Sequence, residues 1–206
     1  MTVAGRYLKV INKKDAACDR AGRSPEDVRL IAVTKTHGAE MINEAIAAGA
    51  TDIGENKAQE LCEKYSDVSP ARWHFIGHLQ TNKVKSIIDK VVMIHSIDSE
   101  KLAAEVDKRA KAANLVMDVL IEVNIGMEDS KSGVLIEETA DLAEHIDKTY
   151  ESVRVRGLMC VPPVSENPED SRPYFKRIKG LFDDMRASGK MKEYFNVLSM
   201  GMSGDY

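Results

Sequence analysis

Short apolar runs alternate with longer amphipathic stretches along most of this 206-residue chain. The runs are rich in β-branched residues and are bounded by polar residues or glycine, which is the pattern of buried strands. They predict seven strands, at about 30–35, 51–54, 73–76, 91–95, 116–123, 153–159 and 196–200.

Between these runs, apolar residues recur at the spacing of an amphipathic helix. The clearest stripe ends before Gly189 and consists of Tyr174, Phe175, Ile178, Leu181, Phe182 and Met185. Further helices are predicted at about 3–21, 41–46, 56–66, 81–89, 99–110 and 135–146. Each strand except the last is therefore followed by a helix, which favours a parallel α/β fold.

Two parallel architectures fit this alternation, an open doubly wound sheet and a closed (β/α)8 barrel of the TIM type. A dinucleotide-binding open sheet would carry G-x-G-x-x-G after its first strand, and neither that motif nor a G-x-x-x-x-G-K-[ST] phosphate loop is present. A barrel needs eight strands, whereas the pattern supplies seven. No linker or internal repeat interrupts the pattern, so residues 1–206 are interpreted as one barrel domain.

Composition and charge exclude several classes of protein. The net charge of −4 comes without a run of like charges, so nucleic acid is not an expected partner. No segment has the length or hydrophobicity of a signal peptide or membrane span, so no membrane association is expected. Three separated cysteines fit a reducing compartment, and a cytoplasmic location is predicted.

Polar side chains follow most of the predicted strands, at the ends where barrel folds place functional groups. In a barrel these strand ends share one face, here called the mouth. The candidates are Lys35, Glu55, Asn56, Gly77, His78, His95, Ser96, Glu122, Asn124, Met159, Cys160 and residues 199–203. Lys35 is open to three interpretations: a solvated end-charge, a phosphate clamp or an amine nucleophile. Burial at the mouth would lower its pKa and allow a Schiff base with an aldehyde.

The segment from Ser199 to Asp205, here called the serine-glycine loop, has the composition of a phosphate site. Glycines permit close backbone approach, and N–H and hydroxyl groups bind phosphate oxygens. In barrels such sites are often built after strands seven and eight. No metal site is expected, because His74 and His78 have a helical spacing on a strand that does not bring them together. Cys160 is interpreted as a buried, inert thiol.

Six blocks carry a resemblance to a known family. LIAVTKT, IGENKAQE, WHFIGHLQTNK, IEVNIGMEDSKSG, VRGLMCVPP and LSMGMSGDY occur in this order and spacing over nearly the whole chain. They resemble the pyridoxal phosphate homeostasis proteins (the YggS/PROSC family), which are similar to the N-terminal domain of alanine racemase and have the fold type III barrel of pyridoxal phosphate proteins. Members of that family continue with a helix and a last strand bearing Arg-x-Gly, so the eighth strand is expected to be missing from this chain.

The resemblance implies a set of cofactor-binding residues. Lys35 would carry pyridoxal 5′-phosphate as an internal aldimine, Asn56, His78 and Met159 would line the pocket, and Ser199, Gly201 and Ser203 would lie near the phosphate. No catalytic residue and no metal ligand are implied.

The function implied is a carrier and regulator of intracellular pyridoxal phosphate without substantial turnover, a monomer or weak dimer that delivers the cofactor to pyridoxal phosphate-dependent apoenzymes. The alternatives are an amino-acid racemase or decarboxylase of fold type III and, third, a Schiff-base aldolase. The racemase would need a second acid/base group opposite Lys35.

Overall fold

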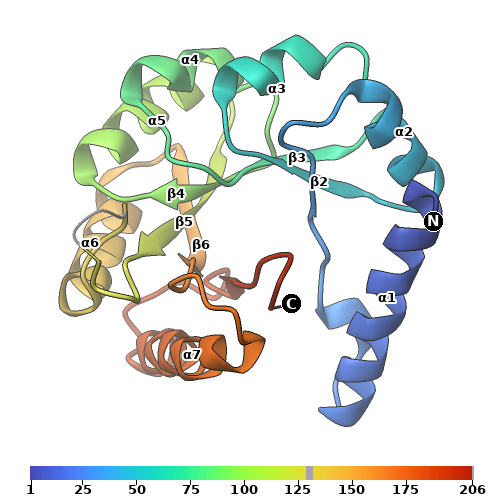
Figure 1. Cartoon of the computed structure of the whole chain (residues 1–206). Coiled ribbons are helices and arrows are strands. Elements are labelled where there is room, and N and C mark those ends of the chain that lie inside the picture. Colours follow the sequence, from blue (N-terminus) through green and yellow to red (C-terminus); the bar gives the residue numbers. More distant parts are fainter. Residues whose placement is uncertain (129–131, 206) are drawn as a thin grey trace.

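The computed structural model describes residues 1–128 and 132–205, and its centre is one parallel sheet of seven strands. The strands follow one another in the order of the chain, from β1 to β7 (Figure 1). Their bounds are Ala32–Val33 (β1), Asp52–Glu55 (β2), Arg72–Phe75 (β3), Met93–Ile97 (β4), Met117–Val123 (β5), Val153–Cys160 (β6) and Val197–Ser199 (β7). The predicted parallel α/β fold with sequential strands is confirmed.

Helices separate the strands and cover the outer side of the sheet. They are α1 (Val3–Arg20), α2 (Ala39–Ala47), α3 (Ala58–Lys64), α4 (Val84–Ile87), α5 (Glu100–Ala112), α6 (Ile136–Thr149) and α7 (Arg172–Ala187). Their starts follow local chemistry: the Ser99 hydroxyl accepts from the Leu102 amide at the beginning of α5, which satisfies one of its free N–H groups. Among the described helices, none has both the length and the apolar character that a membrane crossing requires.

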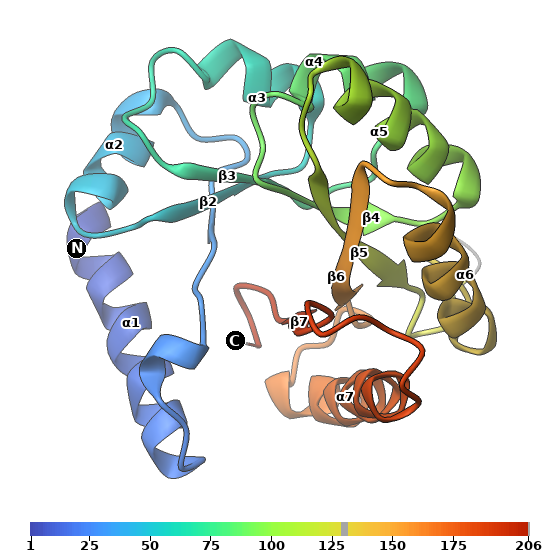
Figure 2. The ribbon, with the colours of Figure 1, turned by 180° about the vertical axis from the view of Figure 1, so that it is seen from behind.

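The sheet curls, so it has a convex side and a concave side (Figures 1 and 2). Alternate residues of each strand point to opposite sides. On the convex side the strands and helices share a large core that includes Ile53, Ile94, Ile121 and Leu158. The concave side has a small apolar cluster formed by Met93, Leu120 and Met159, against which Val161 and Val197 pack. Polar side chains occupy much of the rest of the concave side.

Several predicted boundaries were wrong. The first strand was expected at 30–35, but only Ala32 and Val33 pair, because β1 has β2 alone as a neighbour. The helix expected at 81–89 is a 3-10 turn over Thr81–Lys83 followed by the one-turn helix α4. No eighth strand is present in the described ranges, in agreement with the expectation from the family resemblance, and β1 and β7 are the two edges of the sheet.

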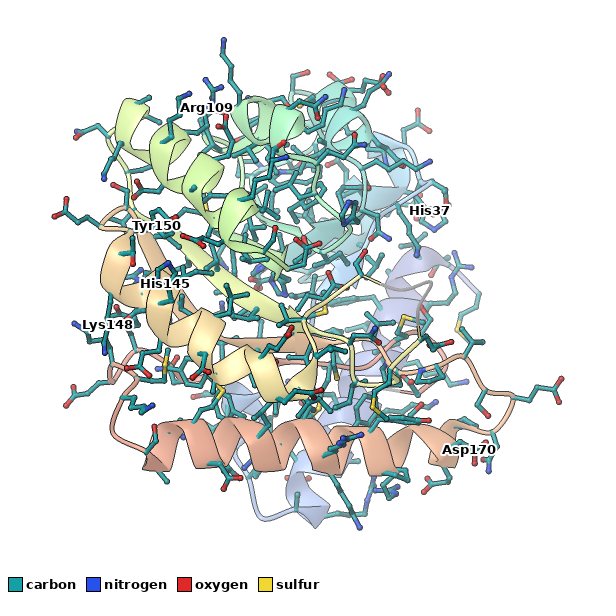
Figure 3. The ribbon with its side chains drawn as sticks, turned by 90° about the vertical axis from the view of Figure 1, so that its left-hand side faces the viewer. His37, Arg109, His145, Lys148, Tyr150 and Asp170 are labelled. Carbon is teal, nitrogen blue, oxygen red and sulfur yellow. The ribbon has the colours of Figure 1, made fainter. Side chains whose placement is uncertain are left out.

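The loops that follow the strands lie on one side of the molecule. His37 comes after β1 and Asp170 after β6, and both lie on this side (Figure 3). Arg109, Lys148 and Tyr150, near the ends of α5 and α6, lie on the opposite side (Figure 3). The candidate residues at the strand ends therefore share a common mouth, as a parallel sheet requires.

Candidate cofactor site at the mouth

Lys35 follows β1 at the mouth, and its side chain is exposed rather than buried. The strand pairs Val33 with Gly54 of β2, which places Val33 on the concave side, and Lys35 follows two residues later in a turn. Val33 itself is 43% exposed, because β1 is an edge of the described sheet. The exposed position of Lys35 thus differs from the buried position that the interpretation as an amine nucleophile assumed.

Hydrogen bonds on both sides of Lys35 hold its backbone. The Thr34 hydroxyl donates to the buried Glu55 carboxylate at 2.7 Å, and the Thr36 amide donates to Glu60. Thr36 has a φ of +66°, a left-handed conformation that is costly for a β-branched residue. The surrounding bonds therefore maintain a strained turn directly after the lysine.

Lys64 connects these groups from helix α3. Its ammonium donates to the Thr34 carbonyl at 3.0 Å, to Glu55 at 2.9 Å and to Glu60 at 2.6 Å. Burial lowers the pKa of Lys64, but the bonds to Glu60 and Glu55 outweigh it, so the pKa is raised. Lys64 is therefore a charged group on the convex side that fixes the backbone at the end of β1.

Asn56 and His78 follow β2 and β3 at the mouth. Gly77 lies so close to Asn56 that an added Cβ would be 2.3 Å from the Asn56 carbonyl oxygen. This contact fixes the Asn56 backbone beside the end of β3. The His78 ring is exposed and lies 3.4 Å from Asp98 and 3.2 Å from the Ser132 hydroxyl. Both residues are at the mouth, and their contact with a cofactor stays a prediction.

Met159 and Cys160 point to opposite sides of β6. Met159 is buried in the small concave cluster, and its contact with a cofactor stays a prediction. Cys160 is buried in the convex core, and burial raises the pKa of its thiol to about 12. The interpretation of Cys160 as an inert core thiol agrees with this placement.

The serine-glycine loop leaves β7 and lies inside the curl (Figures 1 and 2). Gly201 adopts a φ of +92°, which a residue with a Cβ rarely adopts. The Asp205 carboxylate closes the loop, because it accepts from the Met202 amide and, at 2.8 Å, from the Ser171 hydroxyl. Ser199 is partly buried and Ser203 is exposed, so the loop offers hydroxyl groups in two different environments.

A chain of buried hydrogen bonds reaches Ser199 from the other end of the sheet. Asp52 lies 2.9 Å from His74 Nε2, His74 Nδ1 lies 2.9 Å from His95 Nε2, and His95 Nδ1 lies 3.0 Å from Ser199 Oγ. Asp52, His74 and His95 are each at most 2% exposed. We call these four residues the histidine chain. The sequence indicated only that His74 does not pair with His78; its partner His95 lies 21 residues away on the next strand.

Burial dominates the titration of the histidine chain. Burial lowers the pKa of His95 to about 3, with a further contribution from His74. It also lowers the pKa of His74, against the opposing effect of Asp52. Burial alone would raise the pKa of Asp52, but hydrogen bonds from Arg72, His74 and Thr51 hold it well below its usual range. At neutral pH the histidine chain thus contains an ionised Asp52 and two neutral imidazoles.

Glu122, one of the strand-end candidates, is a second group whose titration is controlled by burial. It lies near the end of β5, and alternation along the strand places it with Leu120 on the concave side. Burial raises its pKa to about 7, with a contribution from Asp98, and its Oε2 atom has no partner among the described residues. The sequence signal was its strand-end position alone. In the described part of the chain, no three His, Cys, Asp or Glu side chains gather as a metal-binding group.

A curled parallel sheet with a lysine after its first strand and a glycine-rich hydroxyl loop after its seventh defines a barrel-type class of proteins. Residues 16–206 match the family model of the alanine racemase N-terminal domain. The chain belongs to this family.

Individual relatives support the same conclusion. A pyridoxal phosphate homeostasis protein of Aquifex aeolicus is 45% identical over 100% of this chain and 90% of its own length. A crystal structure from Bifidobacterium adolescentis, of a protein described as unknown, has a TM-score of 0.90 and 32% identity, covering 98% of this chain and 87% of that one. PipY of Synechococcus elongatus with pyridoxal phosphate bound has a TM-score of 0.76 and 29% identity, covering 95% and 90%. The family resemblance expected from the six sequence blocks is confirmed.

Proposed function

We propose that this protein binds pyridoxal 5′-phosphate at the mouth, on Lys35, and carries it without substantial turnover. The observation that carries the proposal is the placement of the exposed Lys35 amine and the serine-glycine loop at the same mouth of the sheet. The name of the Aquifex relative and the cofactor bound to PipY support it.

The residues present fit the cofactor. Lys35 would hold the cofactor covalently through its amine. Gly201 and the Ser203 hydroxyl group suit the phosphate, Ser199 begins the same loop, and Met159 offers an apolar surface. Asn56 and His78 complete the mouth. Bound pyridoxal phosphate would supply the electrophilic aldehyde and an electron-withdrawing ring.

The exposure of Lys35 favours a carrier over an enzyme. An attachment point that water can reach would allow the cofactor to be released to a recipient. Enzymes instead exclude water from reactive intermediates. The expected recipients are pyridoxal phosphate-dependent apoenzymes. The free thiols Cys18, Cys62 and Cys160 fit a reducing compartment, so we place this activity in the cytoplasm.

One observation favours a second candidate, an amino-acid racemase. Glu122 has a pKa of about 7 on the concave side, the value that a general acid/base at neutral pH requires. Racemisation would need Glu122 to reach the face of the bound amino acid opposite Lys35.

The test has two arms. In the first, protein loaded with pyridoxal phosphate and freed of excess is mixed with a pyridoxal phosphate-dependent apoenzyme, and the recovery of the apoenzyme's activity is followed. We expect transfer from the wild type and none from Lys35→Ala; the exposed Lys57→Arg is the matched control and should transfer normally. In the second arm, loaded protein is incubated with L-alanine. Turnover in the usual enzyme range of about 1–10³ s⁻¹, abolished by Glu122→Gln, would replace the carrier by the racemase.

A further inference from the structure

The histidine chain has a fixed direction of hydrogen bonding. The ionised Asp52 only accepts, so His74 donates from Nε2. A neutral imidazole has one donor and one acceptor, so His74 Nδ1 accepts from His95 Nε2. His95 Nδ1 is then left as an acceptor, and among the described residues the Ser199 hydroxyl donates the hydrogen of this bond.

The consequence concerns what Ser199 can offer to a ligand. A serine hydroxyl has one hydrogen and two lone pairs, and the hydrogen is committed to His95. Ser199 therefore presents only lone pairs toward the mouth. A phosphate dianion also carries only acceptors, so it repels this oxygen unless a further proton enters the contact.

One added proton reverses the last bond. If it forms an N–H bond at His95 Nδ1, this nitrogen donates to Ser199 Oγ, and the Ser199 O–H turns from His95 to a phosphate oxygen. The resulting imidazolium lies between a bound phosphate at one end and, through His74, the Asp52 carboxylate at the other. Opposite charges on both sides favour the charged form of a buried group.

We propose that the serine-glycine loop takes up one proton from solvent when it binds a phosphate group, and that the buried pair His74 and His95 holds this proton. The proposal rests on the proposed function, which places the cofactor phosphate at this loop. The histidine chain is thus a pH-dependent control of cofactor affinity: a fall in pH strengthens phosphate binding and a rise weakens it.

Other charged and titratable groups surround His74 and His95. Arg29 and Arg72 flank Asp52 at the far end, and Tyr7 of α1 has a raised pKa owing to burial and to Asp52. On β5 and β6 the concave side carries ionic bonds of Asp118 with Arg154 and Arg156. At the mouth, the remaining charged or titratable groups are Lys35, His78, Asp98, Glu122 and Asp205. Glu122 could also bind or release a proton, so the experiment removes it.

The probe is pyridoxine 5′-phosphate, which lacks the aldehyde and so binds without the proton changes of imine formation. Its binding is measured by calorimetry at about pH 7.5, above the second phosphate pKa of about 6, in two buffers that differ in ionisation enthalpy. All proteins carry Glu122→Gln. We expect proton uptake on binding, and an affinity that falls by up to about tenfold per pH unit as the pH rises.

Variants locate the proton. Uptake should fall close to zero in Ser199→Ala and in His95→Gln, and persist in the control His145→Gln, whose exposed ring pairs with Glu100. Binding without uptake, or uptake that Ser199→Ala leaves unchanged, overturns the proposal. The serine variant and the pH dependence suffice if His95→Gln does not fold. Binding of pyridoxine phosphate without proton uptake leaves the carrier function standing, whereas failure to bind it contradicts both.

Discussion

His95 Nδ1 and Ser199 Oγ lie 3.0 Å apart although the two residues are 104 positions apart in sequence. His95 is on β4 and Ser199 on β7, with β5 and β6 between them in the sheet. Neighbouring strands are about 4.8 Å apart, so a flat sheet would separate the two backbones by about 14 Å. The bond therefore crosses the concave side and links the serine-glycine loop to the middle of the sheet.

The titration of Glu122 predicts a pH-dependent gain in stability from Glu122→Gln. The pKa of about 7 in the folded protein lies above the ordinary glutamate value of 4.5, so the contribution of Glu122 to stability is fully present below about pH 4.5 and is lost as the pH rises through 7. The variant does not ionise and avoids this loss. At pH 8 we expect its free energy of unfolding to exceed that of the wild type by up to about 3 kcal/mol more than at pH 4.

Denaturant unfolding at both pH values measures this difference. Asp98→Asn is the companion variant, because Asp98 contributes to the raised pKa and its removal should reduce the effect. If the free energies of unfolding of Glu122→Gln and wild type differ by the same amount at pH 4 and pH 8, Glu122 is not desolvated.

The histidine chain should change the stability of the protein with pH in the direction opposite to Glu122. His95 has a folded pKa of about 3, below the unfolded value of 6.5, so its stabilisation is present above pH 6.5 and is lost as the pH falls toward 3. In the Glu122→Gln background the unfolding free energy should fall between pH 6.5 and 4.5, with up to about 1.4 kcal/mol per pH unit from each buried histidine.

The comparison is the slope of unfolding free energy against pH with and without His95→Gln. The variant should lose part of the slope, whereas His145→Gln, at an exposed site, should keep it. Equal slopes in all three proteins would mean that His95 is protonated in the folded protein.

The packing of β7 against β6 requires a glycine at position 157. A Cβ at this position would lie 1.7 Å from the Val197 carbonyl oxygen, and the φ of +153° favours glycine. Gly157→Ala should therefore lower the unfolding free energy by at least about 2 kcal/mol and displace β7. Gly180→Ala in α7, where no atom lies within 4 Å, should instead raise it by about 0.5–1 kcal/mol. Thermal unfolding distinguishes the two; a stabilised Gly157→Ala would contradict the observed strand packing.

Much of the fold followed from local pattern. The spacing of apolar residues is enough to identify the strand at 116–123 and the helix over Tyr174 to Met185. The structure has both within a few residues of the predicted bounds. The first strand was overestimated because pairing depends on neighbouring strands, and at β1 the only neighbour is β2. Hydrophobicity indicates that a segment suits a strand, but not how many of its residues pair.

The site was less predictable for a related reason. The strand-end position of Lys35 is a property of one segment, so the sequence indicated it. Its exposure depends on what covers β1, and that is a property of the whole sheet. The contact of His95 with Ser199 depends on the curl of four strands, and no local pattern encodes it. Glu122 was visible as a strand-end residue, but its raised pKa depends on burial and on Asp98.

Covalent trapping tests directly whether Lys35 carries the cofactor. The protein is incubated with pyridoxal phosphate, reduced with borohydride, digested and analysed by peptide mass mapping, with Lys35→Arg and Lys57→Arg in parallel. Reduction converts the imine into a stable amine, so the account predicts a pyridoxyl group on Lys35 in the wild type and in Lys57→Arg, and none in Lys35→Arg. A pyridoxyl group on a different lysine, or no modification of the wild type, would contradict it.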